Sequence, residues 1–190
     1  RPRHDGDGVC RSRVFERSDV DVREKEGLLR VFRPDGKLDY IQDPNNTRIT
    51  CGYSGNDLAS LTHSPSGQTL QLTYSGGRIA TITDPVGRQT TFSYSGDHLT
   101  SASYFDGSVV SYGYATGLGI TREHALSEIA YPGGTHEYFS YDARGRLNGM
   151  SRDGGAEAVT FSFDNAGLVN ATDADGNTSR FYLDHRGLRA

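Results

Sequence analysis

Residues 78–95 read Arg78-Ile79-Ala80-Thr81-Ile82-Thr83-Asp84-Pro85-Val86-Gly87-Arg88-Gln89-Thr90-Thr91-Phe92-Ser93-Tyr94-Ser95, and this stretch decides the fold. Two runs rich in Thr, Ile, Phe and Tyr flank a short turn signal, and residues of these types favour β-strands. In the turn, Pro85 sets φ at the first corner and Gly87 tolerates the positive φ that often follows. The stretch therefore predicts one β-hairpin.

The same hairpin pattern recurs along the chain at intervals of about 20 residues. The leading apolar residue of each unit stands at Leu38, Leu58, Ile79, Leu99, Leu126, Leu147 and Leu168 or Val169, and Leu188 begins a further unit. One longer interval coincides with an insertion at 115–125. The period predicts an all-β protein of tandem antiparallel β-hairpins, about seven units over residues 31–190, that form a curled, meandering β-sheet.

Apolar residues alternate with polar ones in the second strand of each unit, which predicts that one face of the sheet is buried. Each of these strands closes on an aromatic residue: Tyr53, Tyr74, Tyr94, Tyr114, Tyr141 and Phe163. Cys51 occupies the position of Phe92 in this row, which favours a buried, small apolar role. In the first strand the apolar rows lie three residues apart, as in Leu58 and Leu61, and this odd offset does not suit one face of a flat strand. Either a β-bulge or a leading Leu that plugs the preceding turn would resolve the conflict.

Composition excludes several classes of function. The 190 residues carry a net charge of −4 without a basic stripe, so the sequence offers nucleic acid no clustered Lys and Arg. No apolar run is long enough for a transmembrane helix, so we expect no membrane insertion. The six histidines are scattered, and Asp173-Ala174-Asp175-Gly176-Asn177 lacks the Glu that would complete a calcium loop. We therefore expect no catalytic residues, no metal site and no cofactor.

Residues 1–30 do not follow the repeat, and we interpret them as an N-terminal segment that is partly disordered or forms edge strands leading into the array. Val20 and Val22 alternate with Asp19 and Asp21, which favours a short strand. Cys10, in this segment, and Cys51 could form a disulfide in an exported protein, or both could be free thiols. The chain lacks an initiating Met and stops at the opening of a repeat, so we expect a fragment of a longer protein.

Residues 141–147, Tyr141-Asp142-Ala143-Arg144-Gly145-Arg146-Leu147, carry the pattern Tyr-Asp-x-x-Gly-Arg-Leu, and the array resembles the YD or Rhs repeat family. Weaker copies begin at Phe163 and Leu183, whereas Tyr-Ser-Gly replaces Tyr-Asp at Tyr53, Tyr74 and Tyr94. The family includes bacterial Rhs proteins, insecticidal toxin-complex components and the teneurin adhesion proteins. The resemblance implies a long β-sheet ribbon wound into a hollow shell, which encloses a toxic C-terminal domain in bacterial members and serves as an adhesion scaffold in teneurins.

Two functions follow as expectations. The first is a structural segment of a large exported protein, forming part of a shell or surface scaffold without catalytic activity. Its partners would be the rest of the parent protein or an encapsulated domain, and its location extracellular or at the cell surface. The alternative is a carbohydrate- or protein-binding adhesion module, in which exposed aromatic residues near turns stack against glycans or a surface protein. The residues for this role are Tyr40, Tyr104, Phe105 and Tyr131.

Overall fold

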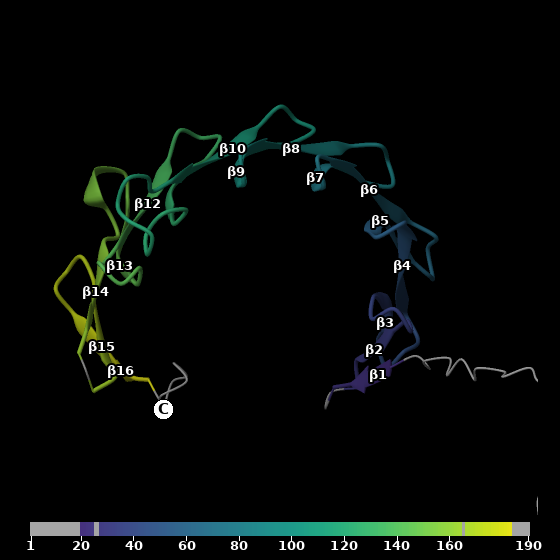
Figure 1. The fold of residues 1–190 in the computed structure, drawn as a ribbon, viewed down its shortest axis with the longest axis horizontal. Coiled ribbons are helices and arrows are strands. Elements are labelled where there is room, and N and C mark those ends of the chain that lie inside the picture. The colour runs from purple at the N-terminus through teal and green to yellow at the C-terminus, as the bar shows by residue number, and fades with distance from the viewer. Residues whose placement is uncertain (1–19, 25–26, 165, 184–190) are drawn as a thin grey trace, which may run out of the picture. The chain divides into compact units, whose positions relative to one another are not determined.

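The computed structural model describes residues 20–24, 27–164 and 166–183, and these form an all-β protein, as predicted. Sixteen antiparallel strands are hydrogen-bonded in chain order, without a crossover, and the described residues contain no α-helix (Figure 1). The strands are β1 (Val20–Arg23), β2 (Leu29–Phe32), β3 (Leu38–Gln42), β4 (Arg48–Ser54), β5 (Asp57–His63), β6 (Thr69–Ser75), β7 (Arg78–Thr83), β8 (Gln89–Ser95), β9 (His98–Ser103), β10 (Val109–Tyr114), β11 (Leu126–Ala130), β12 (His136–Tyr141), β13 (Leu147–Arg152), β14 (Val159–Phe163), β15 (Leu168–Thr172) and β16 (Thr178–Tyr182). A short 3-10 turn, η1 (Asp153–Gly155), separates β13 from β14.

The chain divides into two compact units, of which the first ends at Leu72 and the second begins at Thr73. The division falls within β6, and the hairpin repeat continues in the same pattern before and after it. Strand β1 occupies the position that Val20 and Val22 predict, and it pairs with β2. Cys10 and Leu188 lie outside the described residues, so both the disulfide with Cys51 and the further unit stay predictions.

Two kinds of turn join the strands. In the longer kind the N–H of the first turn residue donates to the carbonyl four residues later, as from Asp84 to Arg88 at 2.9 Å and from Asp142 to Arg146 at 2.9 Å. The residue before that carbonyl has a positive φ, 88° at Gly87. In the shorter kind only two residues separate the paired ends, as between Ser54 and Asp57. The Tyr-Ser-Gly units thus differ from the Tyr-Asp units in turn length, not in fold.

A β-bulge resolves the odd spacing of the first strand. Tyr94 on β8 pairs with Leu99 on β9, and the preceding Ser93 pairs with Ser101, so Thr100 is left without a partner in the ladder. The same shift occurs at Phe32, Tyr53, Tyr114 and Tyr141, each time opposite the leading Leu. The extra residue brings two apolar side chains three positions apart onto one face. Of the two explanations that the sequence left open, the bulge is confirmed.

Strand β15 reaches the same result without a bulge. Phe163 pairs with Val169 and Phe161 with Ala171, two residues on, so the ladder stays regular. Val169 is only 8% exposed, and it therefore takes the leading position in this unit. The sequence had left Leu168 and Val169 as alternatives.

The face that the alternation predicts to be buried is less buried than expected. Among the described residues only Val31, Cys51, Ala102 and Val169 are buried, whereas Ile49, Leu70 and Tyr94 are exposed. Each unit is a single layer of strands, so burial comes from lateral neighbours. Ala102 lies between Phe92 on β8 and Val110 on β10, and it is 3% exposed. A small side chain between two large ones is buried by them, whereas the large side chains remain partly exposed to solvent on the uncovered face.

Candidate functional site

Four closing tyrosines make the same hydrogen bond. The hydroxyl of Tyr53 donates to the carbonyl of Leu38 at 2.9 Å. Tyr94, Tyr114 and Tyr141 donate to the leading residue of their own units, at 3.0, 2.9 and 2.8 Å. The ladder within each hairpin stops short of this leading residue, for example at Tyr40 and Thr50 in the unit of Leu38. The tyrosine therefore satisfies a carbonyl that the splayed hairpin leaves without a strand partner.

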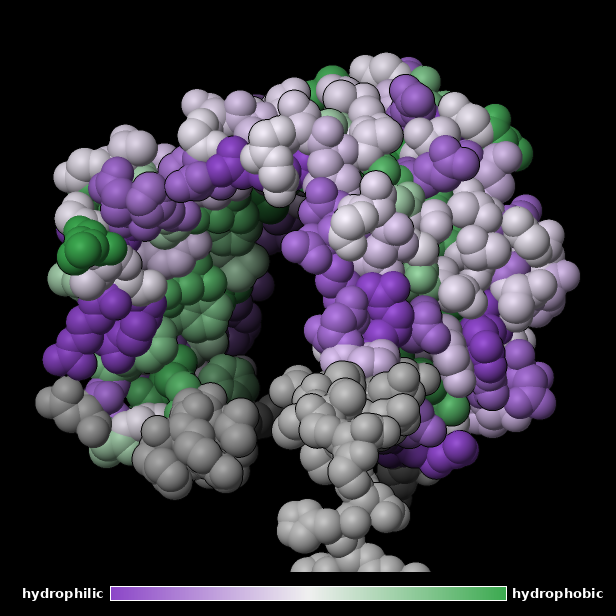
Figure 2. All heavy atoms as spheres, turned by 45° about the vertical axis from the view of Figure 1, so that its right-hand side comes forward, coloured by the Kyte–Doolittle hydropathy of each residue, from purple (hydrophilic) through white to green (hydrophobic). Residues whose placement is uncertain are grey.

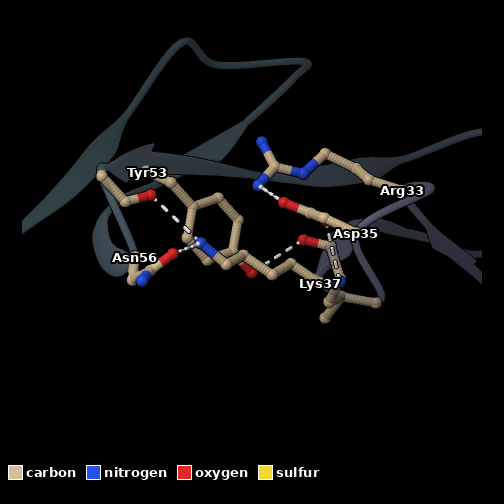
Figure 3. A network of polar contacts seen from close by, with 7 residues as sticks. Arg33, Asp35, Lys37, Tyr53 and Asn56 are labelled. Carbon is tan, nitrogen blue, oxygen red and sulfur yellow. Dashed lines mark hydrogen bonds and ion pairs between the residues drawn. The ribbon is translucent and has the colours of Figure 1, made fainter.

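The residue before the leading Leu covers the closing ring. Lys37 Nζ lies 5.1 Å from the ring centroid of Tyr53, which Arg33 also covers at 4.4 Å (Figure 3). The other pairs of this kind are Arg78 over Tyr94 at 5.5 Å, His98 against Tyr114 at 4.3 Å and Arg146 over Phe163 at 4.0 Å. The Arg and Lys cations favour the faces of aromatic rings, and the ring of His98 packs against Tyr114 as an aromatic pair, so these side chains cover the closing rings. Lys37 also donates to Gly55 O at 3.0 Å and Asn56 Oδ1 at 2.9 Å, which ties one turn to the next (Figure 3).

The Asp of the repeat pattern caps its own turn. Asp142 Oδ1 accepts the backbone N–H of Arg144 at 2.8 Å and of Arg146 at 3.0 Å. Asp43, Asp84, Asp164 and Asp173 accept at the same two positions. Loss of water around Asp142 raises its pKa, but the hydrogen bonds from Arg146 and Arg144 lower the pKa by more, so it lies below its ordinary value. The Tyr, Asp, Arg and Leu of Tyr-Asp-x-x-Gly-Arg-Leu thus each have a structural role.

The four aromatic residues of the predicted binding surface have different surroundings. Tyr40 is half-buried, and the guanidinium of Arg48 covers it at 3.6 Å. Phe105 is 62% exposed although Arg88 lies 4.8 Å from its ring. Tyr104 shares a turn with Phe105 and is 41% exposed. Tyr131 lies in the turn after β11 and is 37% exposed. The binding role of these four residues stays a prediction.

Tyr131 lines a cleft of about 380 Å³, together with Thr135, His136, Glu137, Arg152, Asp153 and Ala156. Its hydroxyl donates to Glu137 Oε2 at 3.2 Å. Burial raises the pKa of the Tyr131 hydroxyl, and the hydrogen bond to Glu137 and the charge of that carboxylate raise it further. His136 Nδ1 lies 2.9 Å from Asp153 Oδ1, and the backbone N–H of His136 donates to Asp153 Oδ2 at 2.8 Å. These contacts anchor η1 to β12.

No group of three or more His, Cys, Asp or Glu side chains among the described residues is arranged to hold a metal ion. Asp173, which begins the segment compared with a calcium loop, instead caps a turn. Its Oδ1 accepts the N–H of Asp175 at 3.0 Å and of Asn177 at 2.8 Å. Cys51 is 8% exposed, and burial raises the pKa of its thiol, as expected for a small side chain in the apolar row.

One polar contact was missed at the sequence level. His124 Nδ1 lies 2.7 Å from His98 Nε2, although the two histidines are 26 residues apart. His124 belongs to the insertion and has a positive φ of 71°. The repeat pattern does not predict this pair, because segment 115–125 lies outside the period.

Comparison with known proteins bears on the repeat itself. Residues 75–109 match the RHS Repeat family profile, and this match contains the whole of β7, β8 and β9 with the turns between them. This part of the chain is therefore similar to the Rhs repeat, in line with the resemblance seen in the sequence. The in-phase tyrosine and turn contacts described above extend the same geometry on both sides of the matched Rhs repeat.

Solved structures show the same fold. TcdB2-TccC3 without its hypervariable C-terminal region matches with a TM-score of 0.50 and 14% identity, over 82% of this chain and 11% of that one. TcdB2-TccC3-Cdc42 matches with a TM-score of 0.50 and 11% identity, over 86% of this chain and 12% of that one. The Photorhabdus luminescens Tc holotoxin pore with the mutation TccC3-D651A matches with a TM-score of 0.53 and 13% identity, over 90% of this chain and 11% of that one. The chain thus spans about a tenth of the length of the solved chains that it matches.

A search of curated proteins finds no match to the chain. Within the described ranges, no helix has the length and hydropathy needed to cross a membrane. The likeness to the solved structures therefore concerns the fold, and the activity of the whole protein is a separate question.

Proposed function

We propose that this chain is a structural segment of a large exported Rhs-repeat protein, and that its repeats form part of a shell or surface scaffold without catalytic activity. The observation that carries the proposal is the repeated use of the same side chains. The hydroxyl, the ring and the carboxylate of the pattern are all engaged by neighbouring strands and turns, as at Tyr94, Arg78 and Asp84. A side chain that holds a turn or satisfies a carbonyl is not available for catalysis.

The open apolar face supports the same proposal. In the compact part that begins at Thr73, the face near the C-terminal end is rich in hydrophobic residues (Figure 2). A cleft of about 310 Å³ on this face is lined by Leu147, Phe161, Phe163, Val169, Phe181 and Leu183. Exposed apolar patches of this kind mark surfaces that contact another part of an assembly. The partner that we propose is the rest of the parent protein or a domain that the shell encloses. Extracellular location is part of the proposal, since the named relatives are toxin-complex components.

Deletion of one unit from the parent protein tests this function. We would remove residues 79–98, which begin at one leading residue and end before the next, so that the flanking hairpins stay in phase. If the repeats form part of a closed scaffold, this deletion opens a gap in its β-sheet. We therefore expect protease digestion of the remaining protein to become faster. The control is Arg88→Lys, which keeps the unit. If digestion of the deletion variant is as slow as that of the parent, the segment is not part of a closed scaffold.

A second measurement tests the absence of catalysis. The purified chain is incubated with chromogenic ester, phosphate-ester, glycoside and peptide substrates. We expect no turnover above the buffer blank. Turnover that a single substitution in the Tyr131 cleft, Glu137→Gln, abolishes would contradict the proposal.

A further inference from the structure

Segment 115–125 joins β10 to β11 and is attached to the repeat array at a few defined points. At its base the N–H of Ala115 donates to the carbonyl of Ala125 at 2.8 Å. At its far side Thr121 Oγ1 donates to the carbonyl of Ala143, in the turn after β12, at 2.9 Å. The third point is the hydrogen bond between His124 and His98 at 2.7 Å. Because the segment forms no strand, its position depends on these contacts.

The histidine pair is itself held in place. The ring of His98 lies against Tyr114, with centroids 4.3 Å apart, and against His124, with centroids 4.7 Å apart. Tyr114 is fixed in turn by its hydrogen bond to Leu99 O at 2.9 Å. His98 is therefore presented from a rigid strand, and His124 comes to it from the insertion.

A hydrogen bond between two imidazoles needs one ring nitrogen that donates and one that accepts. The accepting ring must be neutral at that nitrogen, since a protonated imidazole offers two donors and no acceptor. When both rings carry the proton, two N–H groups and two positive charges face each other across 2.7 Å. The bond is then replaced by repulsion.

The charged groups nearby are engaged elsewhere. Asp97, beside His98, pairs with Arg78 from β7. In the insertion Glu123 Oε2 accepts the N–H of Gly117 at 3.1 Å, and Arg122 donates to the carbonyl of Leu118. Within the described part of the chain no carboxylate forms an ion pair with His98 or His124, whereas His136 has such partners. The second positive charge is therefore not compensated by a bonded carboxylate.

We propose that His98 and His124 form a proton-operated clasp, which holds segment 115–125 against the repeat array at neutral pH and releases it on acidification. The inference does not depend on the scaffold function proposed above. Histidine is the side chain whose charge ordinarily changes between about pH 5 and pH 8. A single proton leaves one donor and one acceptor nitrogen in the pair, so release follows only when both rings are protonated. Release leaves the hairpins intact, because their ladders do not involve the two rings.

Amide hydrogen exchange of the 190-residue chain tests the clasp. Exchange of peptides covering 115–125 is measured by mass spectrometry at about pH 7.5 and about pH 5.5, on either side of the ordinary histidine pKa, with EDTA present. Rates are divided by the intrinsic chemical rate at each pH. We expect protection of 115–125 to fall at least about tenfold at the lower pH, as a local opening, while a peptide from β7 and β8 keeps its protection.

Variants separate the clasp from other effects of acid. In His98→Gln the side chain can still hydrogen-bond but does not titrate, so protection of 115–125 should change less than about twofold with pH. His124→Asn tolerates the positive φ but is too short to reach His98, so protection should be low at both pH values. His63→Gln, at the end of β5, should behave like the parent chain. Equal pH dependence in His98→Gln and in the parent chain, or no pH dependence in the parent chain, would overturn the proposal.

Discussion

At the scale of single residues, the closing tyrosine is used for its hydroxyl as much as for its ring. Tyr94 is 37% exposed, yet its hydroxyl reaches Ile79 O at 3.0 Å. We predict that Tyr94→Phe lowers the free energy of unfolding by about 0.5–1 kcal/mol, because one neutral hydrogen bond is lost and the ring stays. Urea denaturation measures the change. Tyr104→Phe, at an exposed turn, is the control and should have no effect; equal losses in the two variants would contradict this role of the hydroxyl.

The turn aspartates make stability depend on acid. Hydrogen bonds hold the pKa of Asp142 below its ordinary value despite the loss of water around it, and the same holds for Asp84. A carboxyl whose pKa is lower in the folded state stabilises the fold above the unfolded pKa of about 4, and this contribution disappears as pH falls through the folded pKa. We predict that the melting temperature falls between about pH 5 and pH 2.

Asp142→Asn tests this pH dependence. The amide oxygen can still accept the turn N–H groups, but it does not ionise and does not pair with Arg146. The variant should melt at a lower temperature than the parent chain at neutral pH, and its melting temperature should fall less on acidification. Circular dichroism at several pH values measures both. An acid-induced fall as large as in the parent chain would show that these carboxyls do not cause it.

At the scale of elements, the sequence predicts the strands and their order in the sheet well, but not the contacts of the insertion or the degree of burial. Period and alternation predict the hairpins, because each strand needs apolar residues in a fixed place. The spacing of Leu58 and Leu61 also pointed to a bulge as one of two solutions. The contact of His98 with His124 could not be predicted, since it depends on the path of an insertion without a period. Burial was overestimated because alternation shows which face is apolar, not whether a second layer covers it.

Two turn glycines distinguish backbone strain from close contact. Gly87 and Gly145 both have positive φ, 88° and 79°, but a Cβ at Gly87 would meet open space, whereas one at Gly145 would clash with the carbonyl of Thr121 in the insertion. We predict that Gly87→Ala costs about 1–2 kcal/mol from the left-handed backbone alone. Gly145→Ala should cost more, because the insertion must also move. Urea denaturation of both variants decides this; equal costs would mean that the insertion does not press on this turn.

At the scale of the whole molecule, each unit is one layer of strands whose large apolar side chains are open on one side. Val169 is buried between Phe163 and Phe181, but those two rings line an open cleft. A single layer gains its stability laterally, from strand to strand, as repeat proteins do. The uncovered face then remains available for association, and hydrophobic residues gather on it in the part of the chain after Thr73 (Figure 2).

This open face predicts how the isolated chain behaves in solution. Phe161 lines the apolar cleft, whereas the adjacent Thr160 is exposed on the other face of β14, since neighbouring residues of a strand point to opposite sides. Phe161→Lys should therefore reduce both the fluorescence of a bound hydrophobic dye and self-association in light scattering. Thr160→Lys adds the same charge to the same strand and should change neither. If both lysines reduce association equally, net charge rather than the apolar face controls it, and the uncovered face would lose its assigned role in assembly.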